Sequence, residues 1–165
     1  MPNWSIHKKW DLKLGIPYEV SDYIQKAIDS KGSSDKKIPM PEDFKQHTED
    51  RKLQRSRGKN FAIADLNTNL HDRARDKVIQ AEDLKFLLNK GTDSVKAYYL
   101  HFILDYLDHP TIREWLKTTG DSIADCIDKY RKNKAILLPE TNEYLIDVMD
   151  FLKGHSKEVK EDLDI

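Results

Sequence analysis

Apolar residues recur along much of this chain at intervals of three and four, the spacing that gathers them on one face of an α-helix. In the first half, this pattern covers residues 4–14, 17–29 and 60–88. Gly15 ends the first segment and Pro17 opens the second, as expected for residues at the end and the start of a helix. The first half of the chain therefore predicts three helices.

Residues 93–108 are apolar on nearly every side, which is typical of a helix buried at the centre of a bundle. Three further helical patterns follow, one starting at Pro110, one capped by Asp121 or Ser122, and one capped by Thr141 and closed by Gly154. No run of alternating apolar and polar residues indicates a strand. The sequence predicts an all-α single domain over residues 1–165, with about seven helices around the helix at 93–108.

Three segments fall outside this pattern. Residues 30–41 are rich in Lys, Ser, Gly, Asp and Pro and predict a loop, while the charged residues from His155 onward predict a frayed tail. Residues 41–59 carry an excess of positive charge, with only Phe44 and Leu53 as apolar anchors. This polar, basic part of the 30–59 region is either a solvated loop or mobile helix, or an arm that binds a phosphate or an acidic partner.

Composition excludes several classes of protein. The chain has 165 residues, and its longest apolar stretches are interrupted by His101 and Asp105, so we expect no membrane span. Cys126 is the single cysteine, which excludes a disulfide-stapled secreted module. No export signal is evident, and the net charge of −1 gives no global attraction to nucleic acid or anionic lipid. We expect a cytoplasmic protein with Cys126 reduced in its core.

The histidines and aspartates supply the candidate chemistry. His101 and Asp105 stand four residues apart on the most apolar helix, so they share one face, where an uncompensated charge is costly. Asp105 therefore needs a metal ion, a cation or a hydrogen-bond donor. Two interpretations remain open here: a buried pair in which His101 donates to Asp105, or a metal or catalytic site.

Two further sets of residues extend this candidate site. His7 and Asp11 repeat the four-residue spacing, while His71 and Asp72 are adjacent. Arg73 and Arg75 are suited to hold a phosphate, or they pair with neighbouring acidic side chains on a helix surface. Of the remaining histidines, His109 is predicted at a helix end, and His47 and His155 are expected to have no role in a site.

A histidine on an early helix, an adjacent His-Asp pair and an aspartate on a later helix resemble the HD-domain metal-dependent phosphohydrolases. The resemblance implies a divalent metal ion held by His7, His71, Asp72 and Asp105. It makes His101 an added ligand or a phosphate contact.

A partial resemblance links the chain to the zinc-dependent phospholipase C and single-strand nuclease family. It is carried by His101, Asp105 and His109 in sequence, and by Trp4 near the start. No later His-x-x-x-Glu follows, because Val159 occupies that position after His155. This part of the ligand set of a trinuclear zinc site is therefore missing.

Together these residues suggest a metal-dependent phosphohydrolase or phosphodiesterase acting on a nucleotide or another phosphoester. The mixed imidazole and carboxylate set suits Mn, Fe, Zn or Ni. His101 is the expected catalytic acid or base, and Arg73 and Arg75 are the expected substrate-binding residues. The alternative is a non-enzymatic helical interaction module that binds a protein or nucleic acid through the basic residues from Lys45 to Lys59.

Overall fold

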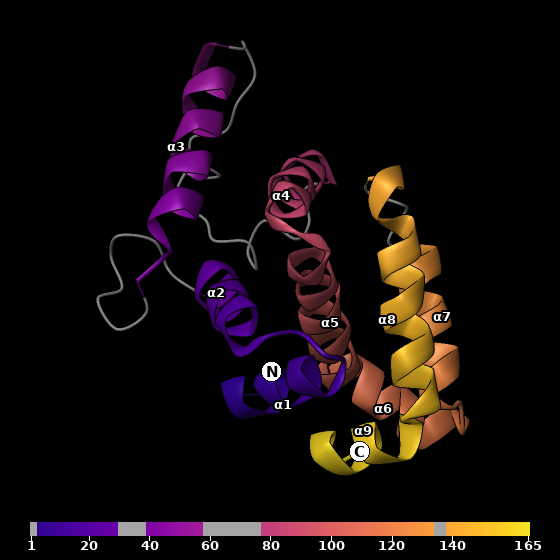
Figure 1. Cartoon of the computed structure of the whole chain (residues 1–165). Helices are drawn as coiled ribbons and strands as arrows, with labels where there is room; N and C mark the ends of the chain where they lie inside the picture. Colours follow the sequence, from indigo (N-terminus) through magenta and orange to yellow (C-terminus); the bar gives the residue numbers. More distant parts are fainter. Residues whose placement is uncertain (1–2, 30–38, 58–76, 134–137) are drawn as a thin grey trace.

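The computed structural model describes residues 3–29, 39–57, 77–133 and 138–165 (Figure 1). Within these ranges the chain forms α-helices, one short 3-10 helix and no strand, which confirms the predicted all-α fold. The elements are α1 (Trp4–Lys13), α2 (Tyr18–Asp29), α3 (Glu42–Arg57), α4 (Lys77–Lys90), α5 (Thr92–Asp108), α6 (Pro110–Thr119), α7 (Ile123–Asn133), η4 (Pro139–Thr141), α8 (Asn142–Gly154) and α9 (Ser156–Leu163).

Helix α5 is the centre of the fold, as its apolar composition predicts. It contacts α1, α2, α4, α6, α7 and α8 (Figure 1). Its buried side chains lie on most of its circumference: Ser94, Val95, Ala97, Tyr98, Tyr99, Leu100, His101, Ile103, Leu104 and Leu107. Gly91 precedes the helix at a φ of +144°, a conformation that L side chains rarely adopt, and this separates α5 from α4.

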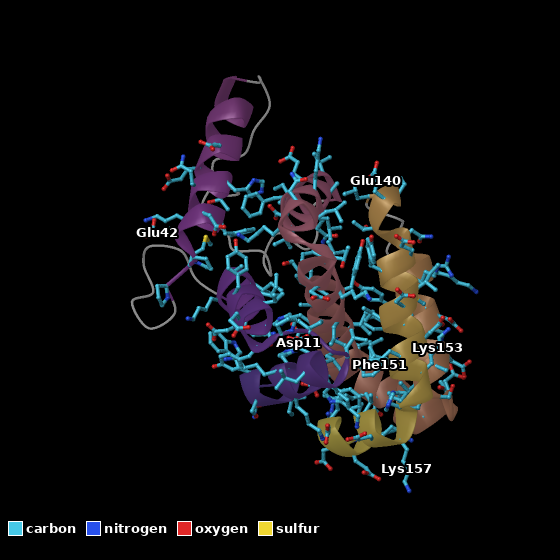
Figure 2. All side chains as sticks on the ribbon, viewed as in Figure 1. Asp11, Glu42, Glu140, Phe151, Lys153 and Lys157 are labelled. Atoms are coloured by element: carbon cyan, nitrogen blue, oxygen red, sulfur yellow. The ribbon has the colours of Figure 1, made fainter. Side chains whose placement is uncertain are left out.

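Helices α1 and α2 pack against each other and against α5. Ile24 and Ile28 on α2 and Trp10 on α1 are fully buried in the shared core. This packing also encloses polar groups, of which Asp11 on α1 is one; it lies inside the bundle, whereas the labelled Lys157 points outward (Figure 2). Residues remote in the sequence are thereby brought to one face of α5.

The C-terminal residues do not fray, which corrects the expectation of a charged tail from His155. They form α9, whose apolar residues Val159 and Leu163 are buried one turn apart. Asp162 on the same helix accepts a hydrogen bond of 2.9 Å from Trp10 Nε1. Lys9 and Lys13 of α1 pair with Glu158 of α9, and Arg113 of α6 donates to the Leu163 carbonyl. The charged segment is therefore ordered by burial of its two apolar residues and by polar contacts with helices of the bundle.

Part of the basic segment is helical. In α3, Phe44 is fully buried against Phe86 of α4, and His47 Nε2 lies 2.8 Å from Asp83 Oδ1. The His47 ring also stacks on Phe86. His47 therefore joins α3 to α4.

Two findings concern the protein classes that the composition excluded, namely membrane-spanning and disulfide-stapled proteins. No helix in the described residues combines the length and the apolar character that crossing a bilayer requires. Cys126 is a free thiol with no exposed surface, in the core as predicted.

Candidate metal centre

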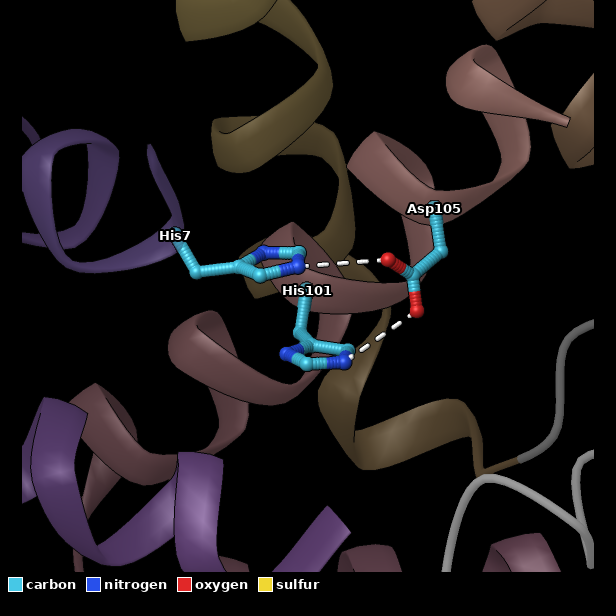
Figure 3. A group of neighbouring side chains, drawn as sticks. All are labelled: His7, His101 and Asp105. Carbon is cyan, nitrogen blue, oxygen red and sulfur yellow. Dashed lines mark ion pairs between the residues drawn. The ribbon is translucent and has the colours of Figure 1, made fainter. Parts of the chain in front are cut away.

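Two imidazoles and one carboxylate converge where α1 meets the middle of α5. His7 Nε2 lies 3.2 Å from Oδ1 of Asp105, and His101 Nε2 lies 3.2 Å from Oδ2 of the same carboxylate (Figure 3). The single Asp105 side chain therefore faces both rings, one with each oxygen.

The two rings are parallel and in contact. Their centroids are 3.9 Å apart, with an angle of 10° between the ring planes. Both rings are buried, while the Asp105 side chain keeps 9% of its surface exposed. One potential ligand atom from each of the three residues lies within 4.8 Å of the others. The group is thus compact enough to share one ion and reaches solvent through Asp105.

The two histidines differ in their affinity for a proton. Burial alone lowers the pKa of His101, but its contacts with Asp105 and Asp29 outweigh this effect and raise the pKa to about 9. The pKa of His7 is lowered, first by burial and then by the neighbouring His101 charge. In the absence of a metal, the two stacked rings therefore carry one positive charge at neutral pH, on His101, opposite the carboxylates.

Asp29, at the end of α2, is the second carboxylate near His101. Its Oδ1 lies 3.6 Å from His101 Nε2, and its Oδ2 accepts a hydrogen bond of 2.5 Å from the indole of Trp4. Burial raises the pKa of Asp29, but the His101 contacts and the Trp4 bond outweigh it, so the pKa is lowered overall. Asp29 is therefore ionised at the edge of the site.

Behind His101, a buried polar chain leads to Asp11. His101 Nδ1 lies 2.8 Å from Gln25 Oε1, and Gln25 Nε2 donates to Asp11 Oδ2 at 3.2 Å. The same carboxylate oxygen accepts a bond of 2.6 Å from the Ser21 hydroxyl. Asp11, Ser21, Gln25 and His101 are all buried. Burial raises the pKa of Asp11 to about 6 despite these donors.

The raised pKa of Asp11 predicts a measurable pH dependence of stability. Because the folded-state pKa of about 6 exceeds the ordinary aspartate pKa of 3.8, the folded protein binds this proton more tightly than the unfolded chain. The contribution of Asp11 to stability is therefore largest below pH 4 and declines by about 3 kcal/mol as the pH rises through 6. Asp11→Asn should remove this decline and stabilise the protein at pH 8.

Urea unfolding of both proteins between pH 4 and pH 8 measures this difference. Asp150→Asn, which neutralises an exposed aspartate, is the matched control and should show the wild-type pH profile. If Asp11→Asn and Asp150→Asn have the same pH profile, Asp11 is not held in an environment that disfavours its charge.

The structure brings together His7 and Asp105, two of the four residues that the sequence suggested as metal ligands. It adds His101, which was expected to be catalytic. His71, Asp72, Arg73 and Arg75 lie outside the described residues. The four-residue spacing of His7 and Asp11 does not give a pair, because His7 faces Asp105 while Asp11 binds Ser21 and Gln25.

Sequence reasoning missed the contribution of α2. Ser21, Gln25 and Asp29 follow one another at intervals of four, so they form a polar row along one side of this helix. The row lies beside the buried Ile24 and Ile28, and Ser21 and Gln25 are buried with them. Polar residues repeating at helical spacing next to an apolar stripe were the available signal.

The remaining histidines have structural roles. His109 lies between α5 and α6, where its Nδ1 accepts a hydrogen bond from the Thr111 N–H, as its predicted position at a helix end suggests. His155 donates from Nδ1 to the Phe151 carbonyl, and its ring packs edge-on against Trp10.

Comparison with known proteins finds no match to this chain among protein-family models, curated proteins or solved structures. The likeness to HD-domain phosphohydrolases and to the phospholipase C and nuclease family therefore stays a prediction from a few residues. The case for a function rests on the geometry of His7, His101 and Asp105.

Proposed function

We propose that this protein binds a divalent transition-metal ion through His7, His101 and Asp105 and uses it to hydrolyse a phosphoester. The observation that carries the proposal is the convergence of two buried imidazoles on the two oxygens of one carboxylate. His101 and Asp105 lie one turn apart on α5, and His7 joins them from α1, a helix far away in the sequence.

The residues fit such an ion in kind and in spacing. Two imidazoles and a carboxylate suit Zn, Fe, Mn or Ni better than Ca or Mg, which prefer oxygen ligands. Around a tetrahedral zinc ion, bonds of about 2.0–2.1 Å separate neighbouring ligand atoms by roughly 3.3 Å. Each Nε2 lies 3.2 Å from a different oxygen of Asp105, a spacing close to this value.

We assign His101 to the ion from the contacts of its two ring nitrogens. Nδ1 is occupied by Gln25, and Nε2 faces Asp105 together with His7. We therefore place His101 among the ligands and not as the acid or base that its position in the sequence suggested.

The chemistry follows from the surrounding carboxylates. His7, His101 and Asp105 would hold the ion, which when bound would supply a water of lowered pKa and polarise a phosphoryl oxygen. Asp29, ionised and 3.6 Å from His101 Nε2, is the group we assign to accept a proton at the site. Arg73 and Arg75 remain the proposed phosphate-binding residues.

Metal uptake by protein purified without a histidine tag tests the metal site. We expect one equivalent of Zn, Mn, Fe or Ni per chain, and thermal stabilisation on adding that ion to the metal-free protein. At an ion concentration 100 times its dissociation constant, the stabilisation should be about 2.7 kcal/mol. Calorimetric titration and elemental analysis provide the stoichiometry, and Mg serves as the comparison ion.

The results separate the two parts of the proposal. Folded protein that contains no metal and takes up none of these ions would contradict it entirely and leave His7, His101 and Asp105 as a structural ion-pair network. Protein that binds one ion but does not hydrolyse phosphomonoesters or phosphodiesters would retain the metal site and exclude the phosphoester substrate.

A further inference from the structure

We infer that Asp11 and Gln25 are positioning residues that hold a proton of His101 on Nδ1, so that in the neutral ring the lone pair lies on Nε2, the nitrogen that faces Asp105. The inference deepens the proposed function, because it explains how one ligand is prepared for a metal ion. It concerns the direction of three hydrogen bonds, and these are set by what each group is able to donate.

The first group in the chain is the Asp11 carboxylate. When ionised it only accepts hydrogen bonds, so both of its partners must donate. Ser21 donates its hydroxyl proton at 2.6 Å, and the Gln25 side chain must present its NH₂ group at 3.2 Å. Asp11 lies on α1 and both donors lie on α2, so the packing of these helices holds the carboxylate in place.

The Gln25 amide transmits this orientation. An amide presents NH₂ on one side and oxygen on the other, so fixing NH₂ on Asp11 directs Oε1 toward His101. Gln25 has no exposed surface, and therefore bulk water cannot compensate for a reversed amide. A flipped Gln25 would place its oxygen against the carboxylate and an N–H against the imidazole.

The His101 ring receives the final bond. With Gln25 Oε1 at 2.8 Å as an acceptor, Nδ1 must carry a proton. In a neutral ring the lone pair then lies on Nε2, the nitrogen that faces Asp105 and is within reach of His7. A histidine that binds a metal through one nitrogen and donates from the other is the usual arrangement of such ligands.

His7 provides the internal contrast. Its Nδ1 is buried and has no hydrogen-bond partner among the described residues. In the part of the chain that the structure describes, nothing equivalent to Gln25 fixes the tautomer of His7, although its Nε2 faces the same carboxylate. Of the two imidazoles, His101 is the one that the fold prepares in advance.

The tautomer of His101 is measurable by ¹⁵N–¹H NMR of the imidazoles in metal-free protein, at a pH where the ring is neutral. We expect the wild-type ring to carry its proton on Nδ1. Gln25→Met removes the acceptor at similar volume, so the proton should move to Nε2, facing Asp105. Asp11→Asn replaces an acceptor by a side chain that offers either oxygen or amide, so both tautomers should be populated.

A compensating pair and a control complete the design. In the double variant Asp11→Asn/Gln25→Glu, the new asparagine donates to the new glutamate, and the glutamate accepts from His101. The proton should therefore return to Nδ1 of His101. Ser21→Ala removes only the other donor to Asp11 and should keep the wild-type tautomer. Far-UV circular dichroism establishes that each variant is folded.

Zinc affinity supplies the second readout. Gln25→Met should weaken binding by about 10–100-fold, the usual effect of losing an outer hydrogen-bond partner of a ligand, and the double variant should recover most of it. A wild-type ring with its proton on Nε2, or an unchanged tautomer in both Gln25→Met and Asp11→Asn, would overturn the inference. If the tautomers behave as expected but wild-type protein binds no metal, the proposed function fails while the positioning chain stands.

Discussion

Replacing Asp105 by asparagine is expected to remove metal binding and, with it, metal-dependent hydrolysis. Asp105 pairs with both His7 and His101, one with each carboxylate oxygen, so its loss removes both ion pairs of the cluster. The loss of zinc affinity should exceed the roughly 10–100-fold that outer-shell substitutions cause. Calorimetric titration with zinc, together with a phosphodiester hydrolysis assay, measures both effects.

Asp108→Asn is the matched control, because Asp108 lies on the same helix and pairs with Arg113 instead of the cluster. It should keep wild-type zinc affinity. The metal-free Asp105→Asn protein should also be less stable, by about 3–5 kcal/mol, since the His101 charge loses its buried partner. If Asp105→Asn lowers stability yet binds zinc as tightly as Asp108→Asn does, the cluster is structural and the proposed metal site is wrong.

Replacing Trp10 by alanine is expected to have the largest effect on stability. The Trp10 ring is fully buried, makes edge contacts with Phe151 and His155, and donates a hydrogen bond to Asp162. Truncation of such a side chain typically costs about 3–5 kcal/mol, because it leaves a cavity as well as losing contacts. Urea unfolding followed by far-UV circular dichroism measures the cost.

Trp10→Phe separates the ring from its hydrogen bond. Phenylalanine keeps most of the buried surface but loses the bond to Asp162, so a smaller loss, near 2 kcal/mol, is expected. Because Trp10 lies one turn after His7 on α1, the alanine variant should also weaken zinc binding by loosening that helix against α9. A cost below 1 kcal/mol for Trp10→Ala would show that α9 does not depend on Trp10 for its place.

The predicted number of about seven helices is close to the nine α-helices of the described residues, and the difference has a physical reason. The repeating apolar stripe predicted α1, α2, α5, α6, α7 and α8 close to their observed limits, because each buries a continuous face. Helix α3 is anchored in the bundle by Phe44 and by the pairing of His47 with Asp83, and α9 by Val159 and Leu163. Two or three anchors in a charged segment leave too little periodicity to detect, although existing helices turn them into stable docking points.

The candidate site was predictable in part. His101 and Asp105 were suggested by their spacing on the most apolar helix, since a carboxylate there requires a partner. The packing of α1 against α5 makes His7 a partner of Asp105. The same packing decides that His7 pairs with Asp105 and not with Asp11. The polar row on α2 contributes to the site because it faces α1 and α5: Ser21 contacts Asp11, while Gln25 and Asp29 contact His101.

The sequence by itself determined that the chain is helical, that residues 93–108 are its centre and that Asp105 needs a compensating group. These properties depend on local periodicity and on the cost of burying charge, and both can be inferred from the sequence. Only the tertiary structure decided that His7 and His101 stack over one carboxylate and that Gln25 links His101 to Asp11. These contacts join side chains on α1, α2 and α5. The packing of the three helices decides which side chains meet, and the spacing of residues within one helix does not predict that packing.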